Sequence, residues 1–174
     1  ASFFTTGGLI AAHANGRDRD AIWDSMQRKE VYGTSGDRIL LWFDLLNAGG
    51  GEKVVMGGET RMGDAPTFEV RAVGAFRQEP GCPDFTAGLI SADKLDRMCR
   101  GECYNPGDER KLITRIEVIR ILPQATPGED IAGLIQDPFR VFDCPENPDG
   151  CTVQFTDEEY PSRGRDAVYY VRAI

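Results

Sequence analysis

The sequence predicts a mainly β domain of the α+β class, a β-sandwich-like unit with two helices. Twenty glycines and ten prolines indicate many turns and short elements. Several short segments alternate apolar and polar residues as half-buried strands do, and two stretches have the apolar spacing of a helix. Six or more short strands separated by turns are typical of a sandwich rather than a helical bundle.

The chain begins with features of one strand and one helix. "GLIAAHA" is a short apolar run between glycine-containing turns, which is typical of a buried strand. A helix is expected over residues 18–30, because Asp18 is a suitable N-cap and Ile22 and Met26 lie four residues apart on one face. Trp23 lies beside them, and we expect the three side chains to form a stripe that packs against the protein.

The later segments predict the strands of the sandwich. "RILLWFDLL" is apolar on both faces, as expected of a strand covered on both sides. "TFEVRAVGAF" places Phe68, Val70, Ala72 and Phe76 on one face, and the last strands are "FRVF", "CTVQF" and "AVYYVRA". The apolar phase changes within "ITRIEVIRIL", which indicates a bulge or burial of both faces, with the bulge favoured. "SADKLDRMC" predicts a short second helix.

The five cysteines predict a disulfide. Cys144 and Cys151 flank "PENPDG", a turn between two strands, and a bridge there would stabilise the fold by roughly 2 to 3 kcal/mol in an oxidising compartment. Cys82 pairs with Cys99 or Cys103 or stays free. The alternatives are reduced thiols in a cytosolic protein, or a zinc site at "CRGEC". The bridge, and with it a periplasmic or secreted location, is the preferred interpretation.

The charge pattern excludes some classes of partner. The net charge is -8, and Lys and Arg are scattered, so we expect no nucleic-acid binding. No run of about 18 apolar residues occurs, so we expect no membrane span. The sequence has no initiator Met or signal-peptide pattern and ends within the strand-like "VYYVRAI", which favours a piece cut from a longer chain.

The residues show no readable catalytic constellation. A hydrolytic site with several metals needs several imidazoles and bridging carboxylates, and this chain has one histidine. We expect His13 to be packed and hydrogen-bonded, and it is a candidate metal ligand only together with residues from upstream. Asp157, Glu158 and Glu159 predict a solvated acidic loop, with calcium binding as the alternative.

Residues 7–46, "GGLIAAHANGRDRDAIWDSMQRKEVYGTSGDRILLWFDLL", with "MGGE" and "YYVRAI", resemble the C-terminal part of domain-of-unknown-function family 3604. That family is similar to the polymerase-and-histidinol-phosphatase (PHP) superfamily of metal-dependent phosphoesterases. The resemblance implies a distorted barrel that holds divalent metals, closed by a strand, a helix and a turn, with a β-rich segment after it. Gly7 to Leu9, Asp20 to Trp23 and Lys29 to Gly36 match this closing pattern, and the metal-binding motifs match nothing here. "AHANG" departs from the pattern, so the resemblance assigns His13 no role.

The resemblance therefore implies that residues 1–36 resemble the end of a PHP-type barrel and that residues 37–174 form a β-sandwich-like domain, or that both fold as one unit. The expected function is a non-catalytic accessory region of a metal-dependent hydrolase, in contact with the upstream catalytic module of the same polypeptide. Divalent metals would belong to that parent protein, and no cofactor is expected in this chain. The alternative is an autonomous extracellular module that binds a carbohydrate or a protein, with Tyr104 or Tyr160 in its binding loops. A complete enzyme in this chain is the least favoured reading.

Overall fold

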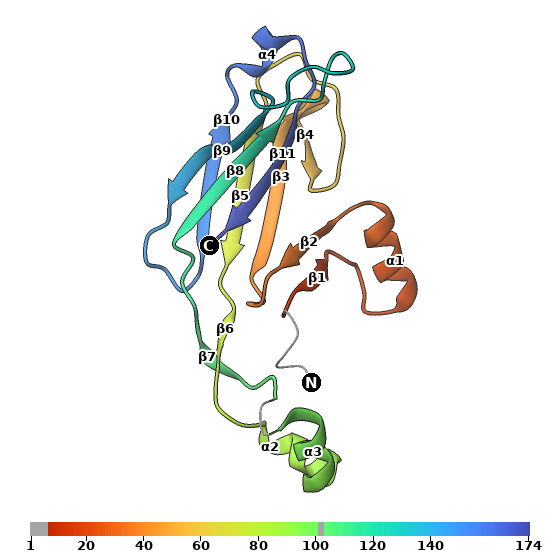
Figure 1. Cartoon of the computed structure of the whole chain (residues 1–174), viewed down its shortest axis with the longest axis vertical. Coiled ribbons are helices and arrows are strands. Elements are labelled where there is room, and N and C mark those ends of the chain that lie inside the picture. The colour runs from red at the N-terminus through yellow and green to blue at the C-terminus, as the bar shows by residue number, and fades with distance from the viewer. Residues whose placement is uncertain (1–6, 101–102) are drawn as a thin grey trace.

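The computed structural model describes residues 7–100 and 103–174, and it is mainly β with four short α-helices. Two antiparallel sheets lie face to face along the length of the molecule, and the helices lie outside them (Figure 1). The predicted class, an α+β chain with a β-sandwich-like domain, is confirmed.

The first sheet has four strands and the second has three. The order of the first is β10 (Cys151–Thr156), β5 (Thr67–Val73), β3 (Leu40–Ala48) and β4 (Glu52–Val55). The order of the second is β11 (Val168–Ala173), β8 (Arg115–Ile121) and β9 (Ile135–Asp143). A short turn, η2 (Gly49–Gly51), joins β3 to β4, and Gly50 and Gly51 adopt φ values of 81° and 76°, which glycine tolerates best.

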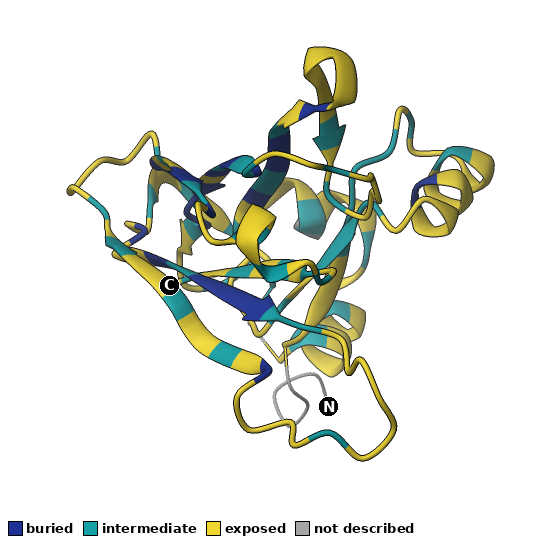
Figure 2. Cartoon of the chain, turned by 90° about the horizontal axis from the view of Figure 1, so that it is seen from above, coloured by how far each residue is buried: buried dark blue, intermediate teal, exposed yellow. Residues whose placement is uncertain are grey.

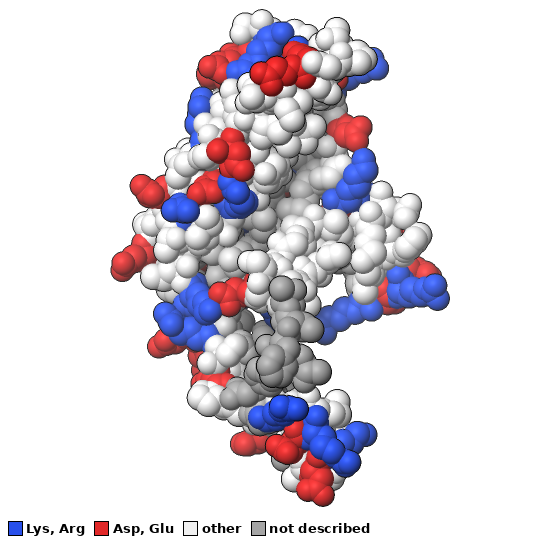
Figure 3. All heavy atoms as spheres, in the orientation of Figure 1, with Lys and Arg blue, Asp and Glu red and all other residues white. Residues whose placement is uncertain are grey.

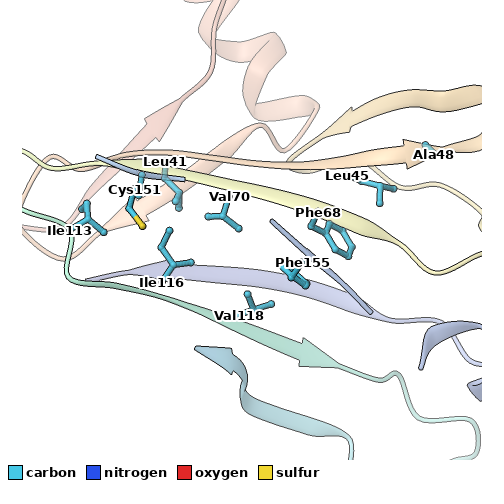
Figure 4. Close-up of a cluster of buried hydrophobic side chains, with 11 residues drawn as sticks. Leu41, Leu45, Ala48, Phe68, Val70, Ile113, Ile116, Val118, Cys151 and Phe155 are labelled. Carbon is cyan, nitrogen blue, oxygen red and sulfur yellow. The ribbon is translucent and has the colours of Figure 1, made fainter. Parts of the chain in front are cut away.

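The core lies between the inward faces of these two sheets, where successive strands contribute alternate residues. Figure 4 shows Leu41, Val70, Phe68 and Phe155 from the first sheet pointing toward Ile116 and Val118 from the second. Phe68 lies at its centre, with ring centroids 5.1 Å from Phe155 and 4.6 Å from Tyr169. Burial of each such side chain stabilises the fold by about 1.5 to 3 kcal/mol.

In the "ITRIEVIRIL" segment the structure shows both burial of the two faces and an irregularity of register. Ile116, Val118, Ile119 and Arg120 of β8 are all buried, so the strand is covered on both faces at its centre. The register against β9 also shifts between Val118 and Arg120, but the extra residues belong to β9. The sequence phase of β8 alone could not show that irregularity, because it lies in the partner strand.

The N-terminal strand–helix unit consists of β1 (Leu9–Ala12), α1 (Arg19–Gln27) and β2 (Val31–Thr34). The strands pair antiparallel in a sheet of their own, and Asp18 caps the helix by accepting a hydrogen bond from the Ala21 amide. The helix is shorter than the predicted range 18–30, because the chain turns at Lys29 with a φ of 60°. Residues 1–6 of the expected segment 1–36 lie outside the described residues, and its boundary at residue 36 stays a prediction.

A two-stranded ribbon, β6 (Phe76–Gln78) and β7 (Pro106–Arg110), carries α2 (Asp84–Leu89) and α3 (Ala92–Cys99) at one end of the molecule (Figure 1). The predicted helix over 91–99 corresponds to α3. The sequence did not predict α2 or α4 (Tyr160–Arg163), since six and four residues are too few for a helical period to emerge.

Exposure follows this division. Figure 2 shows the buried residues concentrated on the strands, whereas the helices are mostly exposed. No helix in residues 7–100 or 103–174 is long and apolar enough to cross a membrane. Acidic and basic side chains are interspersed over the face drawn in Figure 3, which shows no extended basic patch.

Candidate functional site

The strand–helix unit contacts the sandwich through His13 and Tyr32. The His13 Nε2 atom lies 2.9 Å from the carbonyl oxygen of Leu41, and the Tyr32 hydroxyl donates a hydrogen bond to the carbonyl of Ile39 at 2.9 Å. Both acceptors lie at the start of the β3 segment. These hydrogen bonds therefore attach the unit to β3 of the four-stranded sheet.

A second attachment lies at the turn after α1. Lys29 pairs with Glu59 at 2.9 Å, and the backbone of Gly57 lies against the same turn. A Cβ atom added to Gly57 would lie 2.4 Å from the Lys29 carbonyl oxygen, and its φ of +84° also favours glycine. This close approach explains why a glycine follows β4.

His13 is half-buried at this junction. Its amide donates to the Glu30 carbonyl at 2.9 Å, and its ring centroid lies 5.6 Å from that of Tyr32 and 5.9 Å from that of Trp42. With Glu30 and Asp44 it lines a small pocket of about 110 Å³. The Nε2 atom is held by a backbone carbonyl, so a role as metal ligand would need that contact to break.

The apolar stripe of α1 faces solvent. Its exposed fractions are 60% for Trp23, 43% for Met26 and 37% for Ile22, and Ile10 of β1 is 71% exposed. The expectation that this stripe packs against the rest of the described chain is therefore wrong. The residue spacing predicts which helix face is apolar, but the surface that covers that face depends on tertiary contacts. Only Ser25 of the helix is buried, with its hydroxyl donating to the Glu30 carbonyl.

A groove of about 510 Å³ lies on the outer face of the four-stranded sheet. Two cross-strand pairs, Leu40 with Val73 and Trp42 with Arg71, contribute the strand residues. The ribbon strand β7 and the turn before β10 contribute the remaining lining residues, which are Asp108, Arg110, Pro148 and Asp149.

The four charged side chains of the groove are not neutralised by close partners. None of Arg71, Asp108, Arg110 and Asp149 forms an ion pair with another residue in the part of the chain that the structure describes. The Arg71 guanidinium lies over the Trp42 ring, 4.8 Å from its centroid. Arg110 lies 3.8 Å from the Phe76 ring centroid and donates one hydrogen bond to the Gly74 carbonyl. Both arginines thus keep N–H groups for a ligand.

The structure contains two disulfides, one of them the bond between Cys144 and Cys151 that the sequence predicted. Cys144 is bonded to Cys151, Cys82 is bonded to Cys103, and Cys99 is free. The turn between Cys144 and Cys151 joins β9 in one sheet to β10 in the other, so this bond links the two sheets. The pairing of Cys82 depends on how the ribbon places it, which the sequence could not decide.

The cysteines of "CRGEC" are not arranged as the zinc alternative requires. Cys103 is bonded to Cys82, so its sulfur is not a free thiolate that could bind zinc, and residues 101–102 lie outside the described residues. Among residues 7–100 and 103–174, no three His, Cys, Asp or Glu side chains lie close enough together to hold a metal ion. The residues present here do not fit the several-metal site that the PHP resemblance implies for a parent protein.

The expectation of a solvated acidic loop is wrong for Asp157 and is confirmed for the exposed Glu158 and Glu159. Asp157 is fully buried, and its Oδ2 atom accepts hydrogen bonds from Arg120 Nη1 and from the Tyr169 hydroxyl, each at 2.6 Å. Glu159 also pairs with Arg120, although its side chain is 59% exposed. Burial raises the pKa of Asp157, but the hydrogen bonds from Tyr169 and Arg120 outweigh burial and hold that pKa below its ordinary value.

The aromatic residues proposed for ligand loops lie elsewhere. Tyr104 is 48% exposed, and the Arg38 guanidinium lies 3.7 Å from its ring centroid. Tyr160 is half-buried at the start of α4. Neither tyrosine lines the groove. The sequence did not predict the groove, because its lining residues come from four separated segments. The alternation of β3, with Trp42 opposite to the core-facing Leu41, was the one available signal.

Comparison with known families bears on the N-terminal part of the chain. Residues 1–74 match DUF3604. This is a family described as protein of unknown function, and the DUF3604 match includes the β1–α1–β2 unit and the strands β3, β4 and β5. No curated protein and no solved structure matches the chain. The DUF3604 description supplies no activity or ligand.

Proposed function

We propose that this chain is a non-catalytic accessory region of a larger protein, and that its β1–α1–β2 unit docks against a catalytic module that precedes it in the same polypeptide. The observation that carries the proposal is the set of exposed apolar side chains on β1 and α1. We call these residues the docking face, and they are Leu9, Ile10, Ile22, Trp23 and Met26.

The composition of the docking face supports a protein partner. Tryptophan and methionine are enriched at protein interfaces, and several exposed apolar side chains in one small unit favour burial. The strand β1 pairs only with β2 among the described residues, so its other edge keeps backbone groups that a further strand could pair with. A preceding module could bury the apolar face and complete this small sheet.

The identity of the module rests on the sequence resemblance. The pattern over residues 7–46 supports a PHP-like, metal-dependent hydrolase as the preceding module, and the DUF3604 match covers the docking face. Metal ligands would come from that module, because the described residues of this chain hold no cluster of side chains that fits such a site. The two disulfides support a periplasmic or secreted location, where they persist.

The test compares hydrogen exchange of the α1 amides in this chain alone and in the longer polypeptide that the proposal requires. We expect protection of residues 19–27 in the longer polypeptide and fast exchange in the chain alone, since the helix face is exposed. Trp23→Ser should remove that protection. Leu89→Ser, which changes a 76% exposed apolar side chain at the other end of the molecule, is the matched control and should leave it intact.

Two results would overturn the proposal. Equal exchange of α1 in both polypeptides would show that no module covers the docking face. Protection of α1 in the chain alone, together with the mass of a dimer by light scattering, would show that a second copy of this chain is the occupant.

A further inference from the structure

We infer that the groove beside Trp42 is a binding site for a sugar acid, a ligand in which each sugar ring carries one carboxylate beside its hydroxyl groups. This inference concerns a different surface from the docking face, and it goes beyond the proposed function. It rests on the groove's two arginines, its two aspartates and its apolar floor.

The arginines provide a seat for one carboxylate. A guanidinium presents its N–H groups in a planar fork that matches the two oxygens of a carboxylate. Arg71 is oriented by stacking on Trp42, and Arg110 is oriented by Phe76 and by its bond to the Gly74 carbonyl. Side chains that are already oriented lose less conformational entropy when a ligand binds.

The aspartates limit the charge of the ligand and supply acceptors. Asp108 and Asp149 lie in the same groove, so its four charged side chains sum to zero. That balance disfavours a dianion such as phosphate, because each added negative charge meets the aspartates as well as the arginines. Ionised carboxylates accept hydrogen bonds and donate none, so their natural partners in a ligand are hydroxyl groups.

The floor of the groove favours a compact ring over an extended peptide. Leu40, Val73 and Trp42 offer apolar surface to the C–H face of a sugar ring. At the groove, β3 is paired with β5 through Leu40 and Trp42, and β5 is also paired with β10 at Arg71. The groove lies over the face of these strands rather than along an edge, which leaves recognition to side chains. A volume of about 510 Å³ accommodates one or two sugar rings.

The test uses the two tryptophans as reporters. The chain is titrated with tetragalacturonate while the indole N–H resonances of Trp42 and Trp23 are followed by NMR. We expect a saturable shift at Trp42, which lines the groove, and none at Trp23, which lies on α1. Arg71→Met should weaken binding by at least about tenfold, as expected for loss of one bidentate contact. Arg77→Met, an exposed arginine outside the groove, is the matched control.

Four further ligands define the class. Neutral cellotetraose should give no shift at the same concentration. Monomeric galacturonate should shift Trp42 with lower affinity if the natural source is a polymer, and with equal affinity if it is a free sugar acid. Sodium sulfate that shifts Trp42 as strongly as tetragalacturonate would overturn the inference in favour of a plain anion site. A carboxylate-terminated tetrapeptide that binds more tightly than tetragalacturonate would overturn it in favour of a peptide.

Two other results would overturn it outright. The first is the absence of a shift of the Trp42 resonance at about 10 mM tetragalacturonate, a concentration beyond the range of a weak specific complex. The second is equal affinity of the wild-type chain and Arg71→Met for tetragalacturonate. Both variants change exposed side chains, and chemical shifts of the core methyl groups check that each remains folded.

Discussion

Arg120 and Asp157 form an ion pair at one end of the sandwich, with Nη1 and Oδ2 2.6 Å apart and side chains 1% and 0% exposed. Arg120 comes from β8, and Asp157 follows β10 in the opposite sheet. The pair therefore connects the two sheets where the apolar core ends. Arg120 also donates to Gln136 and lies 3.7 Å from the ring centroid of Phe139, so its guanidinium is surrounded by partners.

Removal of Arg120 should leave the buried charge of Asp157 without its ion-pair partner. We expect Arg120→Met to lower the free energy of unfolding by about 3 to 5 kcal/mol, because Asp157 would stay buried with its main charged partner lost. Arg172→Met, which removes a 43% exposed side chain and its pairs with Glu117 and Asp137, should cost less than about 1 kcal/mol. Urea unfolding curves measure both. Equal losses in the two variants would mean that solvent reaches the buried pair.

The same site predicts sensitivity to acid. The pKa of Asp157 is lowered in the folded chain, where hydrogen bonds from Tyr169 and Arg120 overcome the effect of burial. Its contribution is complete above about pH 4, the ordinary pKa of aspartate, and is lost as the pH falls through the folded value. Urea unfolding between pH 7 and pH 3 should show a shallower decline for Asp157→Asn than for wild type. Parallel curves would exclude Asp157 as a cause.

Tyr169 predicts a loss of stability at alkaline pH. Burial, followed by the hydrogen bond to Asp157, raises the pKa of the Tyr169 hydroxyl well above its ordinary value. The protonated form is favoured by folding, so its contribution is complete below about pH 10 and is lost as the pH rises further. Burial also raises the pKa of Tyr32, so absorbance at the tyrosinate band should show two of the five tyrosines titrating late, and Tyr169→Phe should remove the later phase. An unchanged titration in the variant would contradict the assignment.

The disulfides predict a simple labelling pattern. Alkylation without reductant should modify one cysteine, Cys99, and reduction under denaturing conditions should expose all five. Cys144→Ser with Cys151→Ser should lower the free energy of unfolding by about 2 to 3 kcal/mol in the chain-entropy model. Cys99→Ser is the control and should stay within about 0.5 kcal/mol. Mass spectrometry counts the labels, and a second label before reduction would mean that one bond does not form.

The docking face and the core should respond differently in the chain alone. Trp23→Ser removes a 60% exposed side chain and should change the free energy of unfolding by less than about 0.5 kcal/mol. Phe68→Ala removes a side chain that is 7% exposed and should cost about 3 to 5 kcal/mol. Thermal and urea unfolding compare them. A large loss in Trp23→Ser would show that α1 packs on the sandwich in solution.

Local sequence patterns predicted several elements of the fold. The alternation of Phe68, Val70 and Ala72 predicted β5 and its core face, and all three are buried. Asp18 predicted the start of α1, since an N-cap needs only the three residues that follow. These signals are readable because strand period and helix capping depend on neighbours in the sequence.

The corrections all concern contacts between distant segments. Asp157 is acidic and lies among acidic neighbours, so sequence predicted exposure, yet Arg120 lies opposite to it across the sandwich. The stripe of α1 was predicted with its residues, but the surface that would cover it is not among those the structure describes. Trp42 and Arg71 become neighbours only through the register of β3 and β5.

The sequence by itself determined the β-rich class, the core face of β5, the start of α1 and the turn that places Cys144 near Cys151, because these depend on spacing within a few residues. Only the tertiary structure decided the partner of Cys82, the buried Arg120–Asp157 pair, the groove beside Trp42 and the exposure of the docking face. Those features arise where strands from separate parts of the chain meet, and strand order and register are set by the packing of the whole core.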